Sequence, residues 1–363
     1  MDMSTLGEVL RERGPFASVY LDASHDTEDA AKALELRWRG LRDDLARQGA
    51  DEETLRAMDA AAREPAVGKA GRALIAAGGR LLLDRPLPRP PAADSARWSR
   101  RPNLLPLASL IEPQVPHVVV VADRAGADLH AYDGRVETST EVRGDQHPLH
   151  KVGGGGWSHK RMQNAVEETA QRNAARVAEA AETLVEGLNA PLLILGGEVQ
   201  ARAAVREELS PRCRDVLVEV EGASLADGTD DEAFDAAVRS LVAQHRHSRE
   251  HEVVERFTAE SNRDGGLAVQ GMEKVVAALR EANVAALLIA NRTPLGDRMV
   301  FAGDDPAQVA VRESDLRALG VDHVERQPAD EVLTTAAGAT GAEVVITDEA
   351  RLWEGVGALL RHT

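Results

Sequence analysis

The sequence has few cysteines and few aromatic residues, and both shortages limit what the protein can be. Its 363 residues include a single cysteine, Cys213, which permits neither an internal disulfide bond nor a cysteine-based zinc site. The ten Phe, Trp and Tyr residues make up 3% of the chain. We therefore expect aliphatic cores, and base stacking on aromatic platforms is excluded as a main binding strategy. Such cysteine usage is typical of the reducing cytoplasm, which is the predicted location.

Long apolar runs and an excess of positive charge are also missing. The longest aliphatic runs lie near VVVVA and VAALLIA, and the N-terminal MDMSTLGEVLRERG has no apolar core. Neither a signal peptide nor a membrane span is predicted. The 43 Lys and Arg residues against 60 Asp and Glu give a net charge of −17, which excludes a generally basic, DNA-coating protein. We expect neither a membrane nor DNA as a partner.

Proline usage and length divide the chain into three predicted domains. Half of the 16 prolines fall between Pro86 and Pro116, and proline runs interrupt helices and central strands. The predicted domains cover residues 1–113, 114–260 and 261–363. In the first, FASVYLDA is predicted as a strand and residues 30–48 and 52–63 as helices, which gives an α+β domain. The first of these helices places one set of side chains on a common face: Ala33, Leu34, Trp38, Leu41 and Leu45.

The second and third domains are predicted to be of the α/β class. HVVVVADRAGADLHAYDGRV is typical of two strands joined by a turn, and a long helix with apolar residues from Met162 to Leu188 follows the glycine-rich stretch. Strand PLLILGG, helix EVQARAAVREEL, strand DVLVEV and a helix over residues 230–260 complete the second domain. In the third, strands VAALLIA, RMVFA, HVERQ and EVVIT alternate with helices over 272–282, 305–319 and 329–338. Such alternation indicates a largely buried sheet.

Two basic islands stand out against the acidic background. The first runs from residue 80 to 101 and the second from 143 to 161. Both are predicted to be loops, in which Arg and Lys side chains are free to contact the phosphates of a structured RNA. In the alternative interpretation these side chains balance acidic faces of the protein itself. The candidate RNA-binding residues are Arg80, Arg85, Arg89, Arg97, Arg100, Arg101, Arg143, Lys151, Lys160 and Arg161.

A glycine-rich stretch in the second island is the most unusual motif. It reads Gly153, Gly154, Gly155, Gly156, Trp157, Ser158. Four residues without Cβ atoms let the backbone approach a ligand closely, or form a surface linker. No Lys-Ser/Thr follows, so the stretch is not a nucleotide P-loop. Ser158 is the predicted N-cap of the following helix, which places His159 and Gln163 one turn apart on the same face.

Histidines and carboxylates offer weaker alternatives. The histidines of HRHSREH and those around the glycines lack the Glu of the metalloprotease pattern HExxH. Solvated histidines are favoured, and neither a metal nor another cofactor is predicted. A metal-dependent nuclease is a distant alternative, because Asp123 and Glu198 each follow a predicted strand, as the carboxylates of a two-metal site would.

The third domain carries a resemblance to a known family. GGLAVQGMEKVVAALREANVAALLIANR resembles the C-terminal domain of archaeal and eukaryotic class-1 release factors and of Pelota, and GAEVVITDEARLWEGVGALLRH resembles the end of that domain. The opening GPFASVYLDASHDTEDA and the GGGGWS loop are similar to the bacterial branch of this family. That branch includes actinobacterial dormancy-associated proteins and Balon-type hibernation factors, and is related to Ankzf-type peptidyl-tRNA hydrolases.

The resemblance implies a three-domain, release-factor-like ribosome ligand. The α+β N-terminal domain would face the decoding centre, and an RNase-H-like central domain would face the peptidyl transferase centre. An L7Ae-like C-terminal domain would contact a translational GTPase. On this basis the ribosome and its RNA are the expected partners, with peptidyl-tRNA a further candidate. The glycine-rich loop would reach the peptidyl transferase region.

The family's motifs for ester hydrolysis and codon reading are incomplete in this sequence. In release factors a Gly-Gly-Gln tip enters a crowded RNA cavity and helps to position the attacking water. Here Trp157 follows Gly155 and Gly156, and the nearest glutamine, Gln163, is seven residues past Gly156. The first domain contains no Asn-Ile-Lys-Ser motif. The sequence favours a non-decoding A-site factor that protects idle ribosomes. The alternative is a peptidyl-tRNA hydrolase in which Gln163, aided by His159, orients water.

Overall fold

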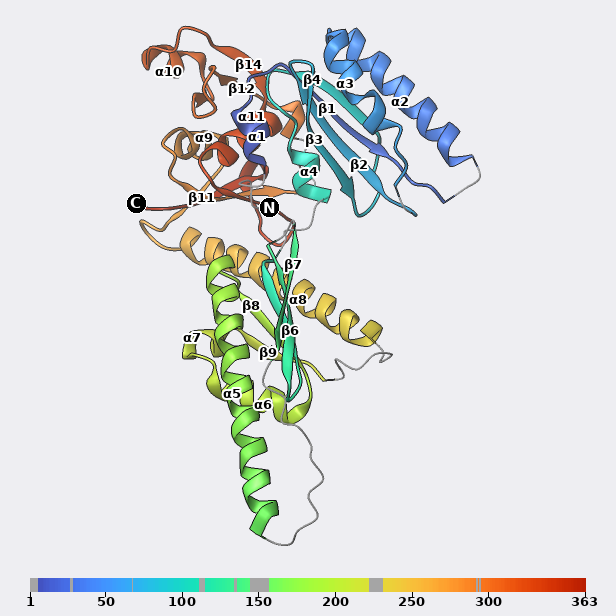
Figure 1. Ribbon diagram of the computed structural model, residues 1–363. Coiled ribbons are helices and arrows are strands. Elements are labelled where there is room, and N and C mark those ends of the chain that lie inside the picture. Colours follow the sequence, from blue (N-terminus) through green and yellow to red (C-terminus); the bar gives the residue numbers. More distant parts are fainter. Residues whose placement is uncertain are drawn as a thin grey trace. The chain divides into compact units, whose positions relative to one another are not determined.

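The computed structural model describes residues 6–26, 29–66, 68–110, 115–133, 136–143, 157–221, 231–291, 293 and 295–363, and of residues 157–166 and 231 it describes the backbone only. The chain forms two compact units. One contains Met1–Pro113 together with His251–Thr363, and the other contains Gln114–Glu250 (Figure 1). The three domain boundaries expected from the sequence stay a prediction. Among the described residues, no helix combines the length and the apolar character needed to cross a bilayer.

The N-terminal part is a four-stranded antiparallel sheet covered by helices on one face (Figure 1). Alternate side chains of β1 serve two cores, as the two-residue period of a strand requires. Val19 and its neighbours pack against Trp38 of α2 and Met58 of α3, whereas Phe16 and Tyr20 belong to the core shared with the C-terminal part. The sheet order is β3-β2-β1-β4, with β1 Phe16–Asp22, β2 Gly71–Ala77, β3 Arg80–Leu87 and β4 Ser95–Ser99. The helices are α1 Gly7–Arg11, α2 Ala30–Arg47, α3 Glu52–Ala62 and α4 Leu105–Leu110.

The first basic island lies largely on strands, so its prediction as a loop is wrong. Arg80 and Arg85 belong to β3 and Arg97 belongs to β4. The prolines misled that prediction. Pro86 is tolerated because β3 is an edge strand. One side of an edge strand has no neighbouring strand, so a residue without an N–H can be placed there without loss of an inter-strand hydrogen bond. The strand and two helices predicted for residues 16–63 are confirmed.

The central unit is a five-stranded sheet in the order β7-β6-β5-β8-β9. The strands are β5 His117–Ala122, β6 Gly126–Tyr132, β7 Glu137–Arg143, β8 Leu192–Gly197 and β9 Leu217–Glu219. The first three are antiparallel, β8 runs parallel to β5, and β9 runs parallel to β8. This mixed sheet confirms the α/β class predicted for the central part.

Helices cover both faces of the central sheet. Their bounds are α5 Trp157–Leu188, α6 Val199–Glu208, α7 Pro211–Asp215 and α8 Asp231–Ser261. Ala174 and Val177 of α5 pack on one face against Val120, and Phe234 of α8 packs on the other against Ile194. All the helices and strands predicted for residues 117–260 are present. Burial on both faces explains why β5 and β8 are continuous aliphatic runs.

The C-terminal part is an α/β sandwich. Its main sheet has the order β10-β16-β11-β15, and a smaller sheet has the order β13-β12-β14. Val276 of α9 and Leu333 of α11 belong to the core on one face, while Phe257 of α8 packs against Leu288 on the other. The elements are β10 Ala268–Gln270, α9 Met272–Arg280, β11 Val284–Ala290, β12 Met299–Ala302, β13 Val309–Ala310, α10 Glu313–Ala318, β14 Glu325–Pro328, α11 Ala329–Ala339, β15 Glu343–Thr347 and β16 Val356–Leu360. The α/β class predicted for this part is confirmed.

One helix of the C-terminal part is much shorter than predicted. The sequence predicts a helix over residues 305–319, but α10 begins only at Glu313. The Asp305 carboxylate accepts a hydrogen bond from the backbone N–H of Ala307 at 2.8 Å, which favours a turn over a helix. The following Val309 and Ala310 form β13 and pair with β12.

Candidate functional site

The glycine-rich stretch joins the projecting end of α5. The 32 residues of this helix correspond to about 48 Å at 1.5 Å per residue. Figure 1 shows that the N-terminal half of α5 extends past the sheet and past α6. Gly153–Gly156 and Lys151 lie outside the described residues. Trp157, Ser158, His159, Lys160, Arg161 and Gln163 lie on α5, with side chains outside the description.

Two details of the predicted loop are corrected by the start of α5. The helix begins at Trp157, so Ser158 is already helical and is not its N-cap. Arg143 ends β7, while Lys160 and Arg161 lie on α5, so these three residues are not in a loop. The predicted catalytic and RNA-binding roles are not affected by these corrections and stay predictions.

The C-terminal part of α5 is fixed to the central sheet. Ala174, Val177 and Ala181 are buried against it. The side-chain amide of Asn173, a residue only 2% exposed, donates a hydrogen bond of 3.1 Å to the backbone oxygen of Arg124 in the β5–β6 turn. This anchored segment supports the projecting end that leads to the glycine-rich stretch.

The two carboxylates proposed for a nuclease lie at the same sheet edge. Ala122 pairs with Gly197 at the ends of the parallel strands β5 and β8, so Asp123 and Glu198 follow neighbouring strands. Asp123 accepts hydrogen bonds from the backbone N–H groups of Ala125 (2.7 Å) and Gly126 (2.8 Å). Glu198 forms an ion pair with Arg124 at 3.5 Å. Both carboxylates therefore have structural partners.

The space beside these carboxylates is small. The cavity next to Asp123 has a volume of about 80 Å³, against the roughly 300 Å³ at the lower end of small-molecule sites. Within the part of the chain that the structure describes, no group of three or more His, Cys, Asp and Glu side chains is placed to hold a metal ion. The described geometry gives the nuclease alternative no support.

Arg97 of the first basic island contacts carboxylates of the C-terminal part. Its Nη1 lies 3.0 Å from Oδ2 of Asp330 and 2.9 Å from Oε1 of Glu331. Glu331 is completely buried, and this burial raises the pKa of its carboxyl, with Arg97 offsetting only part of the effect. Burial acts to lower the pKa of Arg97, but the two carboxylates outweigh it and the pKa is raised.

Arg100 and Arg101, close to Arg97 in the sequence, also contact residues of the C-terminal part. Arg100 forms ion pairs with Asp304 and, at 3.0 Å, with Glu325. Arg101 is 5% exposed, and its Nη2 donates hydrogen bonds to the backbone oxygens of Gly303 (2.9 Å) and Asp305 (3.1 Å). Burial lowers the pKa of Arg101 to about 10, so it remains charged at neutral pH. Together with Arg97, these residues connect the N-terminal sheet to the C-terminal sandwich.

The remaining arginines of the two islands are more exposed. Arg80 forms ion pairs with Glu8 and Glu12, and Arg143 pairs with Glu141 at 2.5 Å. Arg89 is exposed between β3 and β4, and Arg85 is half-buried on β3. The alternative interpretation, in which the arginines balance the protein's own acids, therefore accounts for Arg80, Arg97, Arg100 and Arg143. RNA contact by the islands stays a prediction.

Comparison with known sequences identifies relatives along nearly the whole chain. Residues 116–263 match the model of bacterial archaeo-eukaryotic release factor family 2. The uncharacterized proteins Rv2629 and MT2704, from two strains of Mycobacterium tuberculosis, are each 35% identical over 356 residues, which is 96% of this chain and 94% of the relative.

Among solved structures, the archaeal translation termination factor aRF1 matches 99% of this chain and 98% of its own at 18% identity, with a TM-score of 0.29. Archaeoglobus fulgidus Pelota matches 99% and 92% at 13% identity with a TM-score of 0.33. An archaeal Pelota from a model of ribosome-bound Pelota and ABCE1 matches 99% and 94% at 14% identity with a TM-score of 0.42.

Proposed function

Because the chain belongs to the bacterial archaeo-eukaryotic release factor family, we propose that it is a translation factor that binds the ribosomal A site without reading a stop codon. The missing Asn-Ile-Lys-Ser motif supports the non-decoding part of this proposal. The missing Gly-Gly-Gln tip favours protection of idle ribosomes, as in hibernation or stress, over peptide release. The protein would act in the cytoplasm, where ribosomes are.

The projecting end of α5 is the observation that carries this proposal. A long helix anchored by Asn173 and by its buried alanines is a rigid support for the glycine-rich stretch joined to its first residue. Glycines without Cβ atoms fit a crowded RNA cavity, and Lys160 and Arg161 bring positive charge to the same end. We propose that this end enters the peptidyl transferase region.

Membership of this family also suggests which residues contact ribosomal RNA and which part contacts a protein partner. Arg89 and Lys151 are proposed to bind ribosomal RNA, and so is Arg143, whose pair with Glu141 is exposed to solvent. Arg97, Arg100 and Arg101 instead hold the protein together. A translational GTPase is the proposed partner of the C-terminal sandwich.

Cosedimentation with 70S ribosomes tests the proposal. We expect binding at low salt that weakens as salt rises, because each phosphate contact releases counterions. The charge-reversed variant Lys160→Glu/Arg161→Glu should bind more weakly than wild type. Arg39→Glu, on an exposed face of α2, is the matched control and should bind like wild type. Absence of the protein from the ribosome pellet at low salt would contradict the proposal.

Peptidyl-tRNA hydrolysis is the second candidate. Gln163 and His159 are four residues apart on α5, and this spacing puts them on one helix face. The test is release of a labelled peptide from stalled ribosomes, with Gln163→Ala as the variant. Gln171→Ala, two turns further along the same helix, is the control. Release by wild type and by the control, but not by Gln163→Ala, would establish the hydrolase. No release by wild type supports the protective role.

A further inference from the structure

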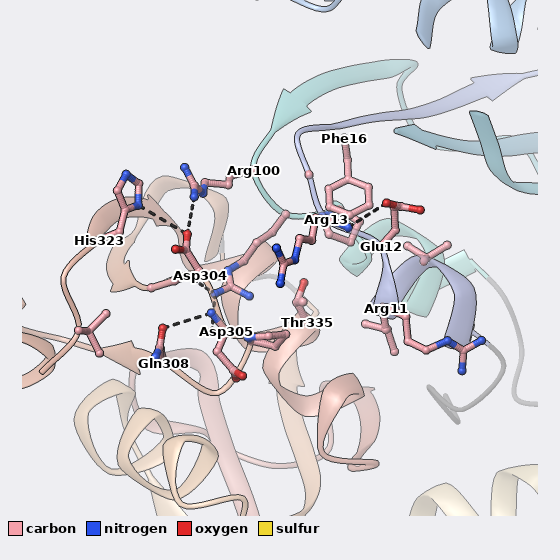
Figure 2. A pocket seen from close by; sticks show the side chains of 18 of the residues that line it. Arg11, Glu12, Arg13, Phe16, Arg100, Asp304, Asp305, Gln308, His323 and Thr335 are labelled. Carbon is pink, nitrogen blue, oxygen red and sulfur yellow. Dashed lines mark hydrogen bonds and ion pairs between the residues drawn. The ribbon is translucent and has the colours of Figure 1, made fainter. Parts of the chain in front are cut away.

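A polar cavity lies between the N-terminal and C-terminal parts of the larger unit, and all the residues that line it belong to that unit. Its volume is about 760 Å³, within the roughly 300–1,000 Å³ of small-molecule sites. One wall comes from residues 9–14, Phe16 and residues 100–102. The other comes from residues 303–306, Gln308, residues 320–323 and Thr335. Figure 2 shows Arg13, Arg100 and Thr335 in this space.

Most of the acidic groups lining the cavity already have partners. Asp304 lies between Arg100 and His323, with 3.6 Å to Nδ1 of the histidine (Figure 2). Asp305 accepts the N–H of Ala307, and Glu12 pairs with Arg80 outside the cavity. The carboxylate of Asp322 is exposed and, within the described chain, has no ion-pair partner.

Three groups in the walls are left without a partner of their own. The guanidinium of Arg13 forms no ion pair with any described residue and extends into the space above Thr335 (Figure 2). Arg101 has two backbone acceptors for Nη2, but its Nε is buried without a hydrogen bond and no described carboxylate lies within ion-pair distance. Thr335 is 4% exposed, and its Oγ1 is also buried without a partner.

Buried polar groups without hydrogen bonds lower the stability of the folded protein unless a bound ligand supplies the missing partners. A buried guanidinium N–H and a buried hydroxyl that lack hydrogen bonds, as at Arg101 and Thr335, both destabilise the fold. Arg101 keeps its charge near neutrality, because burial brings its pKa only to about 10. The planar guanidinium forks of two arginines match the geometry of a phosphate group.

We propose that the cavity binds a small phosphorylated molecule, whose phosphate oxygens accept hydrogen bonds from Arg13, Arg101 and Thr335. The volume of about 760 Å³ favours a ligand of mononucleotide size over a nucleic-acid strand. Arg13 and Arg101 belong to the N-terminal part and Thr335 belongs to α11 of the C-terminal part. The ligand would therefore stabilise the contact between the two parts, independently of whether the protein binds ribosomes.

Thermal unfolding and calorimetry with inorganic phosphate, AMP, GDP and uncharged adenosine, at matched ionic strength, test this proposal. We expect the unfolding temperature to rise with the concentration of at least one phosphate compound, since a ligand that binds only the folded state stabilises it. Binding of inorganic phosphate alone would identify the anion as the ligand. Tighter binding of a nucleotide would show that its nucleoside adds contacts. Adenosine should produce no shift.

Two variants locate the binding groups. Arg13→Gln should weaken binding about tenfold or more, the loss expected for a charge-assisted hydrogen bond. Arg39→Gln is the matched control, because Arg39 forms an exposed ion pair with Glu35 on α2 and does not line the cavity. Thr335→Val keeps the shape of the side chain and removes the unpaired hydroxyl. It should weaken binding without lowering the unfolding temperature of the ligand-free protein.

The binding measurements distinguish a phosphate site from its absence. Saturable binding that is weakened in Arg13→Gln and Thr335→Val, but not in Arg39→Gln, supports the site. Three results would each overturn it: no shift with any phosphate compound relative to sodium chloride at the same ionic strength, equal shifts with AMP and adenosine, or wild-type binding in both cavity variants.

Discussion

Arg97 and Glu331 form an ion pair of 2.9 Å although they are 234 residues apart in the sequence. Arg97 lies on β4 at the edge of the N-terminal sheet, and Glu331 lies in the first turn of α11. The Glu331 carboxylate is completely buried, and its second oxygen has no hydrogen bond. This pair, with Asp330 beside it, joins the first and last parts of the chain.

Replacing Arg97 by methionine should destabilise the larger unit. The change leaves the buried carboxylate of Glu331 without its cation. We expect a loss of about 1–3 kcal/mol in the free energy of unfolding, less than for a fully buried pair because water screens the partly exposed arginine. Urea denaturation measures the loss. Arg39→Met, which removes an exposed pair with Glu35, should cost about 0.5 kcal/mol or less. Equal losses in the two variants would show that the buried pair has no special role.

The pH dependence of stability should reveal the buried carboxyl. Burial raises the pKa of Glu331 above its ordinary value of 4.5, so the folded protein holds this proton more tightly than the unfolded chain does. Its stabilising contribution is then full below the ordinary pKa and is lost as pH rises through the raised value. The free energy of unfolding of wild type minus that of Glu331→Gln should therefore fall as the pH rises above about 4.5. A difference that is flat or rises with pH would contradict this sign.

Two glycines of the central unit should respond oppositely to alanine. Gly197 has a φ of +109°, and an added Cβ would lie 1.9 Å from the backbone oxygen of Ala122. Gly197→Ala must therefore separate β5 from β8, and we expect a loss of about 3 kcal/mol or more. Gly187 on α5 has no neighbour within 4 Å of such a Cβ, so Gly187→Ala should be neutral or stabilise by up to about 1 kcal/mol. Thermal unfolding compares the two. A stable Gly197→Ala protein would be inconsistent with the described strand pairing.

The carboxylate of Asp123 should stabilise the fold and should not bind magnesium. Asp123→Ala removes two hydrogen bonds to the β5–β6 turn and should cost about 1–2 kcal/mol. Glu198→Gln loses only an exposed ion pair and should cost less. Magnesium should not raise the unfolding temperature of wild type relative to Asp123→Ala. Magnesium-dependent RNA cleavage that both variants abolish would restore the nuclease alternative.

Elements with strong local periodicity could be predicted from the sequence. The apolar spacing of α2 places Leu34, Trp38, Leu41 and Leu45 on one face, and all four are buried. The aliphatic runs of β5, β8 and β11 are buried central strands, as predicted. In each case neighbouring residues carry the signal, so no knowledge of distant contacts is needed.

Elements that depend on distant partners could not be predicted. β3 contains Pro86 and two arginines, and only its pairing with β2 makes it a strand. The role of Arg97 was missed because its acidic partners are more than 230 residues away and nothing in the sequence links them. Of the candidate site, the position of the glycine-rich stretch before a long helix was predicted. The unpaired groups of Arg101 and Thr335 carry no local signal.

A cryo-EM map of the protein added to 70S ribosomes tests A-site binding most directly. We expect density for the protein in the A site, with the N-terminal end of α5 and residues 153–156 directed into the peptidyl transferase region and no contact that reads a codon. A protein bound at another position, or one that leaves the A site empty at saturating concentration, would contradict the proposed function.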